Sequence, residues 1–372
     1  MNIYPVHHRR KGSFAMMMLT CLLALAFCLP QASFAAGKVG VSASEEDHVF
    51  RFAGEDRFAT SVAAASEIYP VTERVILVSN SNDFADGLAA SVLAGAVDAP
   101  ILLTQPGQVP DVVADYLASA EVKEIYLIGG PQAISAQVEK TLKQQYQVER
   151  IAGETREATA VQIAKKAKQL APDYFEEVAL IVNGRAPADA LVAGPLAGQG
   201  MPLLMVNKDS IPQVTLKGLQ ELGVKAAFVV GGEAVVSDAV LGQLNNLLPG
   251  TTVNGVKMKA MQIGGDNRME TSLYLAELLP AADVLLVGWE GLADAVSAGY
   301  VGSLLGAPII YTHAGKLDEE VGLYLEAVLY EDSTVTIFGG EKAVSSEVEA
   351  EVKAIFAALL EQQPTDPSTG QE

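Results

Sequence analysis

Three aspartates recur at a similar place in the chain and are the first residues that could do chemistry. Asp86, Asp189 and Asp294 each follow an apolar run and open a stretch rich in Ala, Leu, Val and Gly. Such a carboxylate either satisfies free N–H groups at the start of a helix or contacts a ligand, because open α/β sheets bind ligands at the carboxyl ends of their strands. The sequence alone leaves both interpretations open.

Polar and basic side chains accompany these aspartates. Asn80 and Asn183 end the preceding apolar runs, whereas Gly288 takes that place in the third case. Arginines also recur in a G-x-x-R element further upstream, at Arg57, Arg156 and Arg268. Arginines of this kind form either ion pairs with neighbouring acids or charge-assisted hydrogen bonds to an anionic polymer.

Catalytic arrangements are poorly supported by the residue types present. Asp83 and Asp86 could form the carboxylate pair of a glycosidase, but the corresponding residue downstream is Ala186 or Gly291. No G-x-S-x-G element accompanies the histidines of the chain. We therefore expect a protein without catalytic residues, without a metal site and without a cofactor.

Two further features have a functional and a structural interpretation. The double glycines at 129–130, 231–232 and 339–340 could cradle a phosphate, but they lack the third glycine or the lysine of phosphate-binding loops, so a tight turn is favoured. Trp289, the only tryptophan, either stacks on a sugar or packs within its loop.

These residues recur because the chain contains the same segment three times. The copies begin at Ser79, Asn183 and Gly288, and each contains an Ala-Asp pair, a run of small residues, a proline and an apolar strand. A period of roughly a hundred residues indicates three copies of a whole domain rather than a solenoid. We place repeat one at 48–147, repeat two at 148–257 and repeat three at 258–360.

The elements that position the recurring residues alternate between strand and helix. The strands are continuous apolar runs, such as RVILVS and APILLT, which is typical of parallel strands buried on both faces. Each repeat is therefore expected to be a Rossmann-like α/β unit with a mostly parallel sheet. The run QVERIAG is expected to be the strand that opens repeat two.

The two ends of the chain have a different character. Residues 1–35 hold a basic segment, an apolar run and small residues before a cleavage point, which is the layout of a secretory signal peptide. The alternative, an uncleaved anchor, is disfavoured because the apolar run falls short of the ~20 residues that span a membrane. Residues 36–47 are expected to be a linker and 361–372 a disordered tail.

Composition excludes several kinds of partner. The net charge of −20 argues against nucleic acid, which requires a basic footprint. Both cysteines lie in the signal peptide, so the mature chain has no disulfide and no thiolate metal site. We expect a secreted protein at the cell surface, with no stable membrane insertion after signal cleavage.

The ordered motifs of repeat one carry a family resemblance. GEDRFATS, NDFADGLAAS, PILLT and YLIGG follow one another, and together they resemble the bacterial cell-wall-binding type 2 repeat. The resemblance covers about residues 48–360. It implies three Rossmann-like units packed as a pseudo-threefold trimer in a secreted protein of a Gram-positive bacterium. It also implies non-covalent attachment to an anionic cell-wall polysaccharide or a teichoic-acid-like polymer.

The resemblance also implies a site. The family's anchoring motif Ile-Leu-Leu matches Ile101, Leu102 and Leu103, whereas repeats two and three read Leu-Leu-Met and Ile-Ile-Tyr there. These departures predict unequal binding, with repeat one the main contributor and repeat three mainly structural. The alternatives are an extracellular receptor for a solute or sugar, and an extracellular hydrolase.

Overall fold

The computed structural model describes residues 48–361 except 80–83, 254–255 and 280–281. The predicted signal peptide and linker lie outside the described residues, and so does the predicted tail apart from Glu361, the last residue of a helix. No helix in the described part of the chain is long and apolar enough to cross a membrane.

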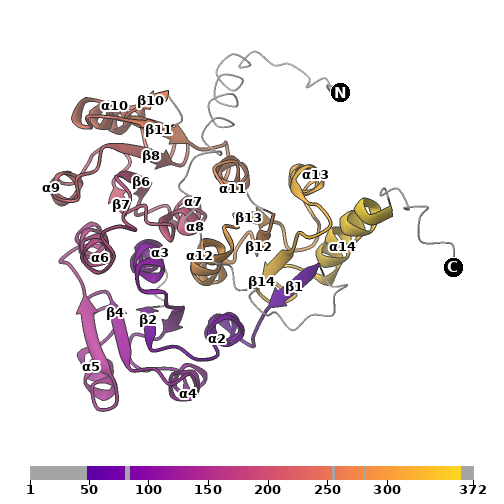
Figure 1. Ribbon diagram of the computed structural model, residues 1–372, viewed down its shortest axis with the longest axis horizontal. Helices are drawn as coiled ribbons and strands as arrows, with labels where there is room; N and C mark the ends of the chain where they lie inside the picture. Colours follow the sequence, from indigo (N-terminus) through magenta and orange to yellow (C-terminus); the bar gives the residue numbers. More distant parts are fainter. Residues whose placement is uncertain (1–47, 80–83, 254–255, 280–281, 362–372) are drawn as a thin grey trace, which may run out of the picture.

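Three parallel four-stranded sheets form the framework of the molecule, as the strand pattern predicts (Figure 1). From one edge to the other, the first sheet consists of β3 (Ile101–Thr104), β2 (Arg74–Ser79), β4 (Glu124–Ile128) and β5 (Gln147–Ile151). In the same direction, the second consists of β7 (Leu203–Val206), β6 (Val178–Asn183), β8 (Ala226–Val230) and β11 (Ala260–Ile263). The third consists of β13 (Ile309–Thr312), β12 (Val284–Gly288), β14 (Val335–Phe338) and β1 (Val49–Phe52).

Helices follow the strands in each repeat. Repeat one contains α2 (Arg57–Ile68), α3 (Ala85–Val97), α4 (Asp111–Ser119) and α5 (Ala136–Leu142). Repeat two contains α6 (Arg156–Leu170), α7 (Pro187–Leu191), α8 (Gly194–Ala197), α9 (Gln213–Glu221) and α10 (Asp238–Leu247). Repeat three contains α11 (Arg268–Ala276), α12 (Leu292–Leu305), α13 (Glu319–Val328) and α14 (Ser346–Glu361).

The strand that opens each repeat belongs to the sheet of the repeat before it. Contrary to the expectation for QVERIAG, β5 pairs with β4 of repeat one, and likewise β11 pairs with β8 of repeat two. The same rule closes the ring, because β1 pairs with β14 of repeat three. The helix that follows each of these strands returns to its own repeat, where α2, α6 and α11 pack against β3, β7 and β13. Each strand–helix connection therefore joins two neighbouring units.

The three units meet at central helices made of small residues. In Figure 1, α3, α7, α8 and α12 gather at the middle of the ring, and α8 and α12 pack closely together. A Cβ added to Gly194 would lie 2.8 Å from the Cα of Gly299 and 3.3 Å from the Oγ of Ser91. Gly198 approaches Ser303 in the same way. The run of small residues in each repeat thus allows three helices to approach the pseudo-threefold axis.

Repeat two differs from the others by an added hairpin. The strands β9 (Thr251–Val253) and β10 (Val256–Met258) pair antiparallel between α10 and β11. This hairpin lies at the outer edge of the ring (Figure 1).

Candidate functional site at the junctions between repeats

Two of the recurring aspartates, Asp189 and Asp294, lie near recurring arginines across the junctions between repeats. Asp294, in the first turn of α12, lies close enough to Arg57 of repeat one for the two charges to interact. Burial raises the pKa of the Asp294 carboxyl to about 6, and the positive charge of Arg57 partly opposes that shift. Arg57 itself is exposed, and its guanidinium lies 5.9 Å from the ring centre of Phe84.

The junction between repeats two and three repeats this arrangement. Asp189 lies in the first turn of α7, beside Thr271 and Arg268 of repeat three. Burial raises the pKa of the Asp189 carboxyl, while the contact with Thr271 and the charge of Arg268 act in the opposite direction. Both described aspartates are therefore first-turn residues rather than N-caps, because the N-caps of their helices are Ala186 and Gly291.

Each arginine is the first residue of a helix whose N-cap precedes it. The caps are Asp56, Thr155 and Asn267, whose side chains accept hydrogen bonds from N–H groups of the first turn. Two of the arginines also hold the loop that follows the second strand of their own repeat. Arg156 donates to the carbonyl of Gly184 at 2.7 Å, and Arg268 donates to the carbonyl of Trp289 at 2.7 Å.

The glycine of the G-x-x-R element has a packing role. The N–H groups of Gly54, Gly153 and Gly265 each donate to a threonine hydroxyl six residues later, at 3.1 Å. A Cβ at any of these three glycines would overlap the first turn of the following helix. The motif therefore places the arginine at the junction and lets the chain turn tightly from strand to helix.

In repeats two and three, the double glycines pack against the aspartates and do not surround an open anion-binding site. Gly231 and Gly339 both have φ of +102°, which favours glycine, and the carboxylates of Asp189 and Asp294 lie beside them. A Cβ on Gly339 would lie 2.7 Å from an oxygen of Asp294. The glycines allow a tight turn, as the sequence favours, and this turn packs against the carboxylate.

Asn183 is committed to the backbone and does not offer a free side chain to a polymer. It is 8% exposed; its Nδ2 donates to the carbonyl of Val235 at 2.7 Å, and its Oδ1 accepts from the N–H of Arg185 at 2.9 Å. In repeat three, the backbone of Ala343 comes so close to Gly288 that no side chain would fit. In both repeats, the residue at the end of the second strand thus contacts the loop that follows the double glycine. Asn183 does so through its side chain and Gly288 through close backbone packing. Asn80 lies outside the described residues, and the side chain of Asp86 is outside them as well.

The predicted Ile-Leu-Leu contact needs correction. Ile101, Leu102 and Leu103 form β3 and have no exposed surface, because the sheet and α2 cover them. The N–H of Leu103 donates to the hydroxyl of Ser61 on α2, which satisfies the edge of the sheet. A polymer cannot touch these side chains in this structure. The motif therefore lies beneath the rim of its repeat, which we define as the carboxyl ends of the strands and the loops that follow them.

The departure from this motif in repeat three has a structural reason. Tyr311 is buried, and its hydroxyl donates to the carbonyl of Ala188 in repeat two at 3.0 Å. The tyrosine thus links β13 to the first turn of α7 in the neighbouring repeat.

Two residues at the rims were not predicted as candidates. Arg185 is exposed in the loop after β6, where the corresponding residue of repeat three is Glu290. Its position directly after Asn183-Gly184 was the available signal. His313 is exposed just after β13, and its ring stacks on Trp289 with centroids 4.7 Å apart.

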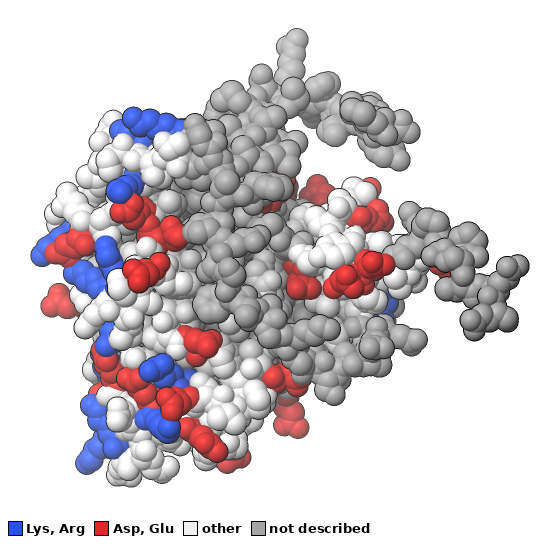
Figure 2. Space-filling model, viewed as in Figure 1, with Lys and Arg blue, Asp and Glu red and all other residues white. Residues whose placement is uncertain are grey.

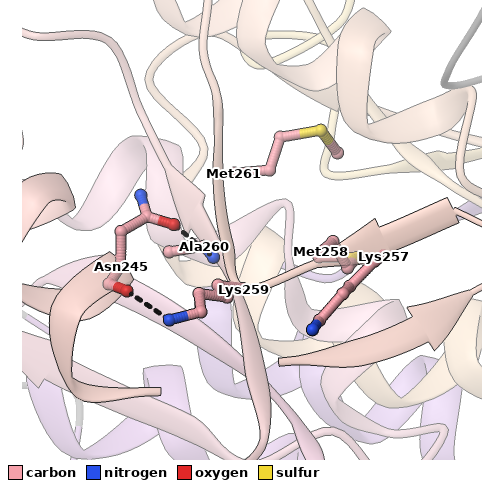
Figure 3. Close-up of a pocket in the computed structure, with 6 residues that line it drawn as sticks. All are labelled: Asn245, Lys257, Met258, Lys259, Ala260 and Met261. Atoms are coloured by element: carbon pink, nitrogen blue, oxygen red, sulfur yellow. Dashed lines mark hydrogen bonds between the residues drawn. The ribbon is translucent and has the colours of Figure 1, made fainter. Parts of the chain in front are cut away.

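The charge on the surface is uneven. On the face shown in Figure 2, acidic side chains occur throughout, whereas most of the basic ones lie over repeats one and two. Figure 3 shows a pocket away from the strand rims, lined by Asn245, Lys257, Met258, Lys259, Ala260 and Met261. The Nζ of Lys259 donates to the carbonyl of Asn245 at 3.0 Å. Within the described ranges, no three His, Cys, Asp or Glu residues are grouped so that they could hold a metal ion.

The fold and the repeated junctions define a class of protein: a ring of three α/β repeats whose sheets share strands. The family model described as Cell wall binding domain 2 matches residues 51–139, 150–241 and 262–349. The chain belongs to this family, and the assignment supports binding to the cell wall.

Relatives and solved structures agree with the family. The chain is 25% identical over 345 residues to N-acetylmuramoyl-L-alanine amidase LytC of Bacillus subtilis, covering 92% of this chain and 63% of that protein. It is 29% identical over 304 residues to the amidase enhancer of the same organism, covering 80% of this chain and 39% of the enhancer. The chain thus spans less than two thirds of the length of either relative.

Two solved structures share the fold. Cwp6 from Clostridium difficile has a TM-score of 0.71 at 25% identity, covering 84% of this chain and 48% of Cwp6. Cwp8 from the same organism has a TM-score of 0.70 at 25% identity, covering 84% of this chain and 52% of Cwp8.

Proposed function

We propose that this chain is a secreted, non-catalytic protein that attaches to the cell wall by binding an anionic polymer at the junctions between its repeats. The polymer is a polysaccharide or is teichoic-acid-like. The observation that carries the proposal is the recurrence of an arginine at the first turn of α2, α6 and α11, where neighbouring units meet. Guanidinium groups held in place bind phosphate and carboxylate groups through charge-assisted hydrogen bonds.

The aspartates at the same junctions determine how much of the positive charge of the arginines is balanced. Asp294 lies beside Arg57, and burial raises its pKa to about 6. Near that pH the carboxyl is partly protonated, so it repels an incoming anion less than an ordinary aspartate would. The exposed Arg57 then faces the solvent with its own charge only partly balanced.

A ring of three related junctions suits a polymer better than a single small solute. A chain with repeated charges can engage several junctions at once, and each later contact forms at a high effective concentration. Weak single sites can therefore give firm attachment in an acidic protein. Arg185 adds a further exposed cation at the rim of repeat two.

Sedimentation with purified walls tests this proposal. The full chain should sediment with intact walls and remain in solution when the anionic polymers have been stripped from them. Arg57→Gln and Arg185→Gln should each weaken binding by ten- to a hundredfold, the equivalent of about 1.5–3 kcal/mol for a bond to a charged group. Lys257→Gln removes the same charge at the pocket away from the rims, and it should bind like the parent.

The same assay separates the alternative functions. Equal sedimentation with intact and stripped walls would overturn the polymer assignment. Release of reducing ends or phosphate from the walls would indicate a hydrolase. Binding of a soluble solute without any sedimentation would indicate a receptor.

A further inference from the structure

We propose that Trp289 and His313 form a stacking platform for a sugar ring at the rim of repeat three. The proposal rests on the proposed function, because it assigns a subsite for the same wall polymer. The two rings are nearly parallel, with planes 10° apart and centroids separated by 4.7 Å. The guanidinium of Arg268 lies 5.0 Å from the centre of the Trp289 ring.

Each member of this stack is held by a second contact. The N–H of Trp289 donates to the carbonyl of Thr312 at 2.7 Å, and its carbonyl accepts from Arg268 at 2.7 Å. The N–H of His313 donates to Asp318 at 3.0 Å, and its Nδ1 lies 2.7 Å from the other carboxylate oxygen. The backbone of Trp289 and the ring of His313 are thus held before a ligand binds, which lowers the entropic cost of stacking on them.

The platform is open to solvent. The side chain of His313 is 54% exposed, and Trp289 is partly exposed beside it. Because His313 stacks on Trp289 and Arg268 lies over the Trp289 ring, the exposed His313 ring offers the face that would accept the apolar C–H face of a pyranose. Nearby polar groups would bind its hydroxyls. Asp318, Arg268 and the exposed Glu290 supply such groups around the stack. The chemistry fits a sugar ring better than a bare anion.

Repeat two lacks this platform. Gly184 occupies the position of Trp289 in repeat two, and Asn207 occupies the position of His313. The part of repeat three that grey atoms leave in view in Figure 2 shows mostly acidic side chains. The repeats thus contribute differently to binding. Repeats one and two offer charged side chains at their rims, and repeat three offers aromatic rings for stacking. This differs from the expectation that repeat three is mainly structural.

The single tryptophan of the chain makes the platform directly observable. Fluorescence of the full chain is measured while three probes are added: N-acetylglucosamine oligomers, anionic polysaccharide released from walls, and inorganic polyphosphate. A saturable change with either glycan, and none with polyphosphate, is the expected result. The glycan that binds more tightly identifies the wall component. The same response to polyphosphate would mean an anion site at Arg268 and would overturn the platform.

Matched variants separate the platform from ordinary loop packing. His313→Ala should weaken the glycan titration about tenfold or more. His48→Ala removes an equivalent stack, on Phe356 with centroids 4.7 Å apart, away from the rims, and it should leave the titration unchanged. Trp289→Phe keeps a flat ring and should retain glycan binding by calorimetry, whereas Trp289→Ala should lose it. Thermal melts establish that each variant is folded.

The outcome also separates this proposal from the proposed function. If the parent sediments with walls but no glycan changes its fluorescence, the platform is wrong and attachment stands. If His313→Ala and His48→Ala bind glycan with equal affinity, the platform is also wrong. If the parent does not sediment with walls at all, the attachment itself is wrong.

Discussion

Asp294 is a titratable group near Arg57, at the junction that closes the ring. The folded pKa of Asp294 is about 6, whereas an aspartate in an unfolded chain has a pKa of about 3.9. The folded state thus favours the protonated carboxyl. Its stability relative to the unfolded state is greatest below the unfolded pKa and falls as the pH rises through the folded value.

Asp294→Asn should remove this pH dependence. At pH 7 we expect the variant to be more stable than the parent by about 1–2 kcal/mol, less than the full pKa shift implies because the carboxylate is partly exposed and attracted to Arg57. At pH 4 the difference should be small. Denaturant unfolding at both pH values measures the difference in free energy of unfolding. If this free energy changes with pH equally in the two proteins, the Asp294 carboxyl is not the source of the pH dependence.

Substitution of Leu102 tests whether the Ile-Leu-Leu motif affects wall binding only by stabilising the fold. The side chain has no exposed surface in β3, so Leu102→Ala should lower the free energy of unfolding by about 2–5 kcal/mol. At a temperature where circular dichroism shows the variant to be folded, it should sediment with walls like the parent. Lost sedimentation of a fully folded variant would restore a direct role for this motif.

At the scale of elements, the central helices require their small residues. Gly302 of α12 faces Pro195 of repeat two, and a Cβ there would lie 2.6 Å from the proline ring. Gly302→Ala should therefore cost about 1–3 kcal/mol through overpacking. Gly242 of α10 has no neighbour within 4 Å of an added Cβ, so Gly242→Ala should stabilise the chain by about 0.5–1 kcal/mol. Denaturant unfolding measures the stability of both variants. If Gly302→Ala and Gly242→Ala change the free energy of unfolding in the same direction, the close approach of the central helices is contradicted.

At the scale of the whole molecule, the exchanged strands determine which fragments can fold. Residues 48–147 carry β1 without its partner β14 and lack nearly all of β5. Residues 54–152 contain the complete sheet from β3 to β5 and omit β1. We expect the second fragment to show more protected amides in hydrogen exchange than the first.

A deletion in the full chain tests the same rule. Removing residues 48–52 should increase amide exchange in β14, because that strand loses its parallel neighbour. Strands β2 and β4 of repeat one should keep their protection. The opposite pattern would mean that β1 stabilises the repeat in which it lies by sequence.

The sequence by itself determined much of this protein. Apolar strands, proline before each edge strand and double glycines after the fourth strand of each repeat recur with the same period. Local patterning of this kind is sufficient to predict an α/β unit three times over. The first-turn position of Asp189 and Asp294 was also predictable, because it depends on residues close by in the chain.

Only the tertiary structure decided how the repeats combine. A sequence does not show which sheet edge a short strand will join. The sequence pattern places β1, β5 and β11 in repeats one, two and three, whereas β5 and β11 pair with the repeat before them and β1 pairs with repeat three. The partners of Asp189 and Asp294 are likewise distant in the chain, and only the ring brings Arg268 and Arg57 to them. The burial of Leu102 and the stacking of His313 on Trp289 depend on the same long-range packing, which local spacing does not encode.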